Sequence, residues 1–311
     1  MLGRRAFLAG AALALAQGKA LAATSAPLPK AEQVGDGLWV VRGADEPIAW
    51  GNGGAIANSV ILDAPAGAVL IDPGPSRLYG QALGRLAQRL CSKKVGMVLI
   101  THLHPDHAMG ACAFDPAIVH ALPQTRKDIG EQGSDFADAL YRILAGAMQG
   151  TTVLTPQGDL AAGPLDAMGR GLQLYALNGH SAGDLVVLDE QTQALITGDL
   201  VFHNRAPATP HARIDQWQDS LSKLEAIPHR LLIPGHGPLD TGGEALAQTR
   251  DWLGWVQDSL QRAVDSGLDM VEAGALPIPD RFAPLRQARY EWQRSVAHFY
   301  AGLETQALPI L

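Results

Sequence analysis

One short stretch constrains this chain more than any other: three histidines and an aspartate with the spacing H-x-H-x-D-H at residues 102–107. It directly follows an apolar run, residues 95–100, that is rich in Val, Ile and Leu and that we expect to form a buried strand. The polar cluster therefore lies on the loop that leaves the carboxyl end of a strand, where sheets flanked by helices place their functional sites.

The spacing within this cluster favours metal binding over a loop that is histidine-rich by chance. His102 and His104 are two positions apart, so in extended chain they project to the same side and can share one cation. Pro105 turns the chain, which directs Asp106 and His107 elsewhere, towards a second cation. The sequence holds only ten histidines, so three within six positions are hard to obtain at random.

Three further candidate ligands each stand beside glycine after a predicted strand. They are His180 in N-G-H-S-A-G-D, Asp199 in T-G-D-L-V-F and His236 in P-G-H-G. Taken singly, a histidine next to glycine is most often an ordinary surface residue. The repeated context, in a chain that also contains the 102–107 cluster, predicts that all three join it.

The order and context of T-H-x-H-x-D-H, G-H-S-x-G-D, T-G-D-x-V-F and P-G-H-G resemble the metallo-β-lactamase-fold hydrolase superfamily over residues 34–239. This resemblance implies an α/β fold, the αββα sandwich of that superfamily. True zinc β-lactamases carry Cys or Ser in the region of Asp199. The aspartate makes the chain similar to the glyoxalase II-like branch, which cleaves thioesters or esters.

The resemblance also implies two zinc ions per chain and a bridging hydroxide that attacks the substrate carbonyl. One ion is expected to bind His102, His104 and His180, with Asp199 bridging both ions. Asp106 and Asp199 are the expected catalytic carboxylates. Asp106, His107 and His236 are expected to bind the second ion. Asp72 is expected to hold the ligands in place without binding metal itself.

A narrower resemblance rests on shorter motifs. The N-terminal signal, H-N-R-A-P at residues 203–207 and R-Y-E-W-Q-R-S at residues 289–295 resemble the periplasmic quinoprotein relay system zinc metallohydrolase group. It suggests an association with quinoprotein dehydrogenase systems. His203, Asn204, Arg205 and His211 follow the bridging aspartate and are predicted to face the substrate, with an ordinary solvated loop as the equal alternative.

The N-terminus is predicted to be a targeting segment. Arg4 and Arg5 precede a Gly/Ala-rich apolar stretch and an A-x-A site ending at Ala22, as in twin-arginine export signals. We therefore expect a signal at residues 1–22, a linker at 23–33 and a periplasmic mature chain.

Cleavage of this signal removes three basic residues and lowers the formal net charge by three, from −7 to −10. Such an acidic chain is not expected to bind nucleic acid, and no apolar run is long enough to span a membrane.

Two units are expected after the linker: the metal-binding domain at residues 34–241 and a helical extension at 242–311. Helical periodicity predicts a helix capped by Ser76, and others at residues 215–227, 244–264 and 284–303. Trp252, Trp255 and Trp292 are either core residues or a face that docks a second copy or a dehydrogenase partner. Strands are expected at residues 38–42, 56–62, 68–72, 95–100, 117–120, 172–176, 185–188, 194–197 and 231–233.

Several alternatives remain open. The same fold carries mononuclear iron enzymes such as persulfide dioxygenases, which bind iron with two histidines and one aspartate. A zinc β-lactamase or lactonase activity, and a non-catalytic accessory protein, are further alternatives. Cys91 and Cys112 are the only cysteines, and the sequence does not decide between a disulfide and two free thiols.

Overall fold

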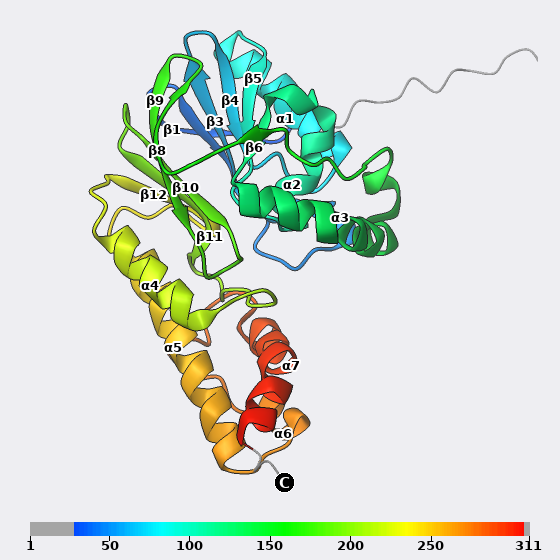
Figure 1. Cartoon of the computed structure of the whole chain (residues 1–311), viewed down its shortest axis with the longest axis vertical. Helices are drawn as coiled ribbons and strands as arrows, with labels where there is room; N and C mark the ends of the chain where they lie inside the picture. Colours follow the sequence, from blue (N-terminus) through cyan, green and yellow to red (C-terminus); the bar gives the residue numbers. More distant parts are fainter. Residues whose placement is uncertain (1–27, 308–311) are drawn as a thin grey trace, which may run out of the picture.

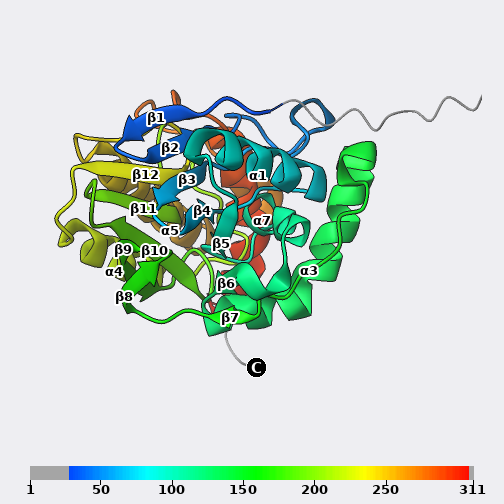
Figure 2. The ribbon, with the colours of Figure 1, turned by 90° about the horizontal axis from the view of Figure 1, so that it is seen from above.

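The computed structural model describes residues 28–307. The predicted signal at 1–22 and the first part of the predicted linker lie outside these residues. Two sheets face each other, with α1 and α3 outside one sheet and α4 outside the other (Figures 1 and 2). The αββα sandwich expected from the resemblance is therefore observed.

The first sheet is antiparallel from β1 to β4 and parallel from β4 to β7. In the second sheet, β11 pairs with β12 in parallel and the other neighbours are antiparallel. The first sheet contains β1 (Glu32–Gly35), β2 (Leu38–Val41), β3 (Ser59–Ala64), β4 (Gly67–Ile71), β5 (Val95–Leu99), β6 (Val119–Ala121) and β7 (Gly158–Asp159), in that order. The second contains β12 (Leu231–His236), β11 (Ala194–Phe202), β10 (Asp184–Asp189), β9 (Arg170–Leu177) and β8 (Gly163–Ala167), in that order.

Successive residues of a strand point to opposite faces of its sheet, and in both sheets each face packs against an apolar layer. Val60 and Leu62 of β3 pack between the sheets, whereas Ile61 points to the opposite face and packs with α1. The strand β10 alternates in the same way, with Val187 between the sheets and Val186 towards the outer helices. Such strands read as continuous apolar runs because neither face meets solvent.

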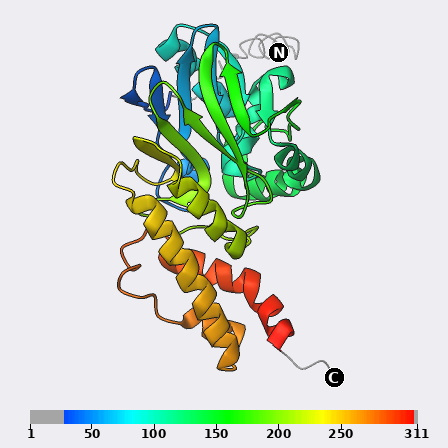
Figure 3. The ribbon, with the colours of Figure 1, turned by 60° about the vertical axis from the view of Figure 1, so that its left-hand side comes forward.

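The helices cover the outer faces and form a C-terminal lobe. Ser76 caps α1 as predicted, its side chain accepting a hydrogen bond from the backbone N–H of Tyr79. Figure 3 shows α5 and α7 extending beyond the sandwich. The helices are α1 (Arg77–Cys91), α2 (Pro105–Ala108), α3 (Pro123–Leu144), α4 (Ile214–Glu225), α5 (Glu244–Asp265), α6 (Met270–Ala275) and α7 (Ala288–Ala307).

The C-terminal lobe differs in detail from the expected pair of helices. The short helix α6 lies between the two expected helices, in a segment where Pro277 and Pro279 favoured a loop. The helix α7 begins four residues later than the predicted 284–303 helix. Trp252, Trp255 and Trp292 are at most 8 % exposed and belong to the core that joins this lobe to the second sheet. They therefore do not form a docking face, and a dimer or dehydrogenase partner stays a prediction.

Cys91 and Cys112 are both free cysteines, which answers the question that the sequence left open. Within residues 28–307, none of the helices has the length and apolar character that a bilayer span requires.

Candidate metal centre

The 102–107 cluster connects the end of β5 to α2. Pro105 occupies the first position of α2, which its fixed φ favours, so the chain turns from extended to helical geometry between His104 and Asp106. This turn separates the two pairs of ligands as the spacing predicted. His102 and His104 enter one group of potential metal ligands, and Asp106 and His107 enter another.

The three remaining ligands come from the second sheet. His180 lies on the turn after β9, and His236 is the last residue of β12. Asp199 lies within β11 rather than after a strand, because β11 continues to Phe202 through an irregularity at Gly198, whose φ is +51°. Gly235 permits the approach of this carboxylate, because a Cβ there would lie 1.9 Å from Asp199 Oδ1.

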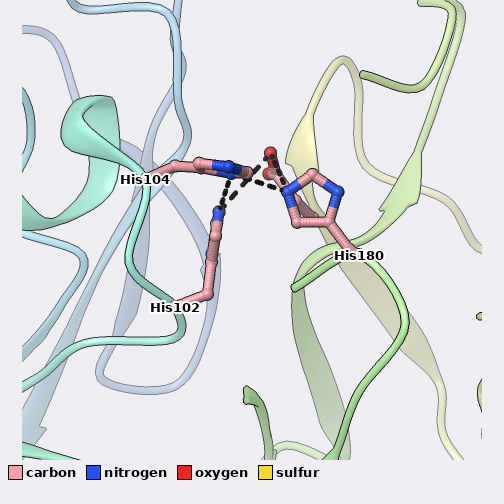
Figure 4. A group of neighbouring side chains, drawn as sticks. His102, His104 and His180 are labelled. Atoms are coloured by element: carbon pink, nitrogen blue, oxygen red, sulfur yellow. Dashed lines mark hydrogen bonds and ion pairs between the residues drawn. The ribbon is translucent and has the colours of Figure 1, made fainter. Parts of the chain in front are cut away.

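The first group comprises His102, His104, His180 and Asp199, all buried. His104 Nδ1 lies 2.9 Å from His102 Nε2 and 2.8 Å from His180 Nε2. Asp199 Oδ2 is 3.4 Å from His180 Nε2 and 3.7 Å from His102 Nε2. Figure 4 shows the three imidazoles converging on one point, as ligands of a shared cation do.

The second group comprises Asp106, His107 and His236. Asp106 Oδ2 lies 3.3 Å from His236 Nε2 and 3.8 Å from His107 Nε2. Asp199 also reaches this group: its Oδ1 is 3.1 Å from His107 Nε2, and its Oδ2 is 3.3 Å from His236 Nε2. The carboxylate of Asp199 is therefore in contact with both groups, and all seven side chains singled out in the sequence come together.

The second nitrogen of several imidazoles is held by a partner outside the two groups. Asp72, predicted as a support, accepts from His107 Nδ1 at 2.7 Å and from the Thr101 hydroxyl at 2.7 Å. Thr101 Oγ1 in turn lies 3.0 Å from His102 Nδ1. His236 Nδ1 lies 2.8 Å from the carbonyl oxygen of Ile56. These contacts favour the tautomers in which the converging nitrogens carry free lone pairs.

The electrostatics of the cluster suit cation binding. Burial lowers the pKa of His102 and His104 well below its usual value and that of His180 to about 4, so these rings are neutral at pH 7. Burial acts to raise the pKa of Asp199, but the neighbouring charges of His236 and His107 outweigh it and hold the pKa well below its usual value. Neutral imidazoles and ionised carboxylates are the forms that bind metal.

Unpaired atoms give an independent test of whether the residues fit a metal. His107 Nε2 and Asp199 Oδ1 face each other, yet neither makes a hydrogen bond of acceptable geometry within residues 28–307. Buried polar atoms without partners are rare, and each calls for an explanation. Two divalent cations would supply it, because imidazole nitrogen and carboxylate oxygen are the donors that zinc accepts.

A cavity of about 380 Å³ opens onto the metal-binding residues. Its walls come from the 47–56 segment, from α3, from the segment after β11 and from α7. Among the residues predicted to face the substrate, Arg205 and His211 line the cavity, and His211 Nδ1 is 2.8 Å from His104 Nε2. His203 and Asn204 are not among the lining residues: His203 Nδ1 lies 2.9 Å from the carbonyl oxygen of Pro238, and Asn204 is exposed.

Sequence reasoning missed several residues around the site. Thr101 is the first residue of the T-H-x-H-x-D-H motif, but no role was predicted for it. The α7 residues Tyr290, Glu291 and Arg294 were not predicted to line the cavity. Asn58 was not singled out, although its Nδ2 donates to the carbonyl oxygens of Pro234 and Gly237 and so holds the loop that carries His236. A buried asparagine between apolar residues in 56–62 was the available signal.

Comparison with known proteins decides the family. Residues 52–236, more than half of the chain, match the family model described as "Metallo-beta-lactamase superfamily". The chain belongs to this superfamily. The prediction of family and fold is therefore confirmed, and the superfamily region contains all seven candidate ligands.

Individual relatives are distant. A linear primary-alkylsulfatase from a Pseudomonas species is 23 % identical over an alignment of 261 residues that covers 70 % of this chain and 49 % of that protein. The human protein named acyl-coenzyme A thioesterase MBLAC2 is 24 % identical over an alignment of 220 residues that covers 64 % of this chain and 72 % of that protein. This chain thus spans about half the length of the alkylsulfatase. A metallo-beta-lactamase structure from Pontibacter korlensis aligns with a TM-score of 0.59 at 21 % identity, covering 72 % of this chain and 98 % of that one, and shares the fold.

Proposed function

We propose that this chain is a dinuclear zinc hydrolase that cleaves a thioester or ester bond, as glyoxalase II-like enzymes do. The observation that carries the proposal is the position of Asp199, whose carboxylate lies within 3.4 Å of His180 in one ligand group and 3.1 Å of His107 in the other. A carboxylate shared in this way is suited to bridging two cations, and two-metal sites of this kind serve hydrolysis.

Two zinc ions held by these seven residues would supply a hydroxide nucleophile near neutral pH and polarise a carbonyl oxygen. The protein's own part is to fix the ligands and shape the cavity. Asp72 and Thr101 hold His107 and His102 in place, and the strands that carry His236 and Asp199 are buried. Rigid ligands of this kind reduce the reorganisation needed during reaction.

The nucleophile is proposed to come from solvent. The described residues that line the cavity include no serine, threonine or cysteine, so the walls offer no side chain suited to an acyl-enzyme. Support for a thioester comes from the named thioesterase among the relatives. The apolar wall formed by Phe136, Leu140 and Ile143 of α3 suits an acyl chain.

We further propose that the protein acts in the periplasm after twin-arginine export, in connection with quinoprotein dehydrogenase systems. Support comes from the paired arginines, Arg4 and Arg5, and from the A-x-A site ending at Ala22. Replacing both arginines by lysine should retain the full-length chain inside the cytoplasm. Export of the double variant at the wild-type level, measured by cell fractionation, would overturn this part of the proposal.

A substrate panel tests the hydrolase. Purified, zinc-loaded protein should hydrolyse acyl thioesters, with weaker activity on simple esters, and EDTA should abolish the reaction. Lactones and cephalosporins serve as competing substrates, and a persulfide with oxygen uptake tests the iron dioxygenase. Zinc-loaded protein that cleaves cephalosporins but no thioester or ester, or iron-dependent oxygen uptake, would replace the proposal.

A further inference from the structure

One cation in the cavity wall has most of its hydrogen-bonding capacity unused. Arg205 is 4 % exposed, and its Nη1 donates to the carbonyl oxygens of Ala44 at 3.3 Å and Glu46 at 3.1 Å. Nε has no hydrogen-bond partner within residues 28–307, and no hydrogen bond from Nη2 to these residues is present. The two carbonyls therefore fix the guanidinium plane and leave its other edge unpaired.

That unpaired edge has a specific geometry. Nε–H and one N–H of Nη2 point in parallel and match the two oxygens of a carboxylate. A buried cation with unused donors is costly, and an anionic ligand removes that cost. Arg205 thus offers one half of a bidentate ion pair, held ready by the 44–46 backbone.

The helix α7 supplies a carboxylate to the same cavity, but that carboxylate already has a partner. Glu291 is 1 % exposed, and its two oxygens accept from Arg294 Nη1 at 3.1 and 2.9 Å. Burial raises the pKa of Glu291, and the positive charges of Arg294 and Arg205 oppose that rise. Because Glu291 is used by Arg294, Arg205 is left for a ligand.

The side chains around Arg205 favour an anionic ligand. Apart from the metal-binding residues, the charged side chains lining the cavity are Arg205, Arg294 and Glu291, which leave one net positive charge. The neighbouring walls are apolar, with Ile48 on one side and Leu140 on another.

We propose that Arg205 binds a free carboxylate of the substrate, so that the enzyme acts on thioesters or esters that carry a carboxylate as well as an apolar acyl portion. This inference rests on the proposed hydrolase function and names the substrate class. The Glu291–Arg294 pair of α7 closes the wall beside Arg205, which gives the C-terminal lobe a part in substrate selection.

Two matched pairs of thioesters test the inference on wild-type protein. One pair places the charge in the thiol half: the hexanoyl thioesters of 3-mercaptopropionate and of its amide. The other places it in the acyl half: monothioesters of adipate and of its monoamide. We expect kcat/KM to favour the carboxylate member of at least one pair about 100-fold, mainly through KM. Equal kcat/KM within both pairs would overturn the inference and leave the hydrolase proposal standing.

Variants assign the preference to Arg205. Arg205→Lys keeps the charge but loses the planar pair of donors, and we expect the preference to fall at least tenfold. Arg205→Met removes the charge as well and should abolish the preference. Arg126→Lys, in an exposed pair with Asp159 at 2.8 Å, is the matched control. A preference that survives in Arg205→Lys, in protein with wild-type zinc content and thermal stability, would overturn the assignment whether or not Arg205→Met folds.

A binding measurement separates failure of the inference from failure of the hydrolase proposal. The thioether 3-(hexylthio)propionate cannot be hydrolysed, and its binding can be measured by calorimetry against that of its amide. Wild-type protein should bind the carboxylate more tightly, and Arg205→Lys should lose most of the difference. If neither thioester pair is cleaved, the hydrolase proposal fails, and equal binding by wild type and Arg205→Lys would then reject the carboxylate site as well.

Discussion

Two buried clusters of charged side chains, one around Arg170 and one at the metal centre, differ in how completely their charges are satisfied. Arg170 of β9 makes five hydrogen bonds: two to the carboxylate of Asp189, each at 2.7 Å, and three to the backbone carbonyls of Asp36, Gly37 and Asp63. These equal the five N–H donors of a guanidinium. The metal centre brings together seven buried ligands and leaves His107 Nε2 and Asp199 Oδ1 without hydrogen-bond partners among the described residues.

The difference separates a structural site from a functional one. The Arg170 cluster joins the second sheet to the β1–β2 turn and to β3 of the first sheet, and nothing remains for a ligand to satisfy. The metal centre is incomplete by itself, as is Arg205 at the cavity wall. Unpaired buried polar atoms are costly. At the metal centre they belong to His107, His180 and Asp199, all of them potential metal ligands, and this grouping indicates a ligand that completes the site.

The largest expected effect follows from removing the carboxylate shared by both ligand groups. Asp199→Asn keeps the shape but removes the negative charge, and kcat/KM on a thioester should fall about 1,000-fold or more. Zinc content should fall below two ions per chain. Asp159→Asn, at an exposed carboxylate, is the control and should match wild type. A variant with full zinc content and unchanged turnover would break the distinction between the two sites.

A large effect of another kind is expected at the saturated site. Arg170→Met leaves Asp189 buried without its partner, and the free energy of unfolding should fall by about 3–5 kcal/mol. The metal centre is untouched, so zinc content and kcat per folded molecule should remain at wild-type values. Denaturant titration and metal analysis on the same sample check both statements. Loss of zinc at full stability would contradict the structural role.

The pH dependence sharpens the same comparison. Burial acts to raise the pKa of Asp189, but the hydrogen bonds and charge of Arg170 outweigh it and hold the pKa below its usual value. A lowered folded-state pKa means that the stabilisation is complete above about pH 4 and is lost as pH falls through the lowered value. In Arg170→Met the Asp189 carboxyl keeps only the hydrogen bonds from Thr192 and should protonate more readily. The stability gap between the proteins, measured with EDTA present, should therefore be widest near pH 7 and narrow in acid; a gap that widens in acid would contradict this.

The smallest effect is expected at a residue first predicted to face the substrate. Asn204 is exposed, lies outside the cavity lining and has a φ of +54°. Asn204→Gly accommodates that backbone conformation, so kcat/KM should stay within about twofold and stability within about 0.5 kcal/mol of wild type. A tenfold loss of kcat/KM would return Asn204 to the substrate site.

The sequence predicted the metal centre better than the cavity, for a physical reason. The ligands lie in short motifs whose spacing reflects local geometry, as with Pro105 turning the chain between His104 and Asp106. Arg205 and Glu291 line the same cavity only after the C-terminal lobe folds back, and nothing local to either residue signals the other. The helix α6 was also missed, although Asp269 and Glu272 form a capping box at its start, because nearby prolines suggested a loop.

The central claim is that a pair of metal ions binds the two ligand groups and so provides partners for their unpaired buried nitrogen and oxygen atoms. Metal stoichiometry tests this claim most directly. Native mass spectrometry of protein purified without added metal should show two zinc ions per folded chain and fewer in Asp199→Asn. A folded, catalytically active chain that carries no transition metal would contradict the account, and a single iron per chain would replace the zinc pair with the mononuclear alternative.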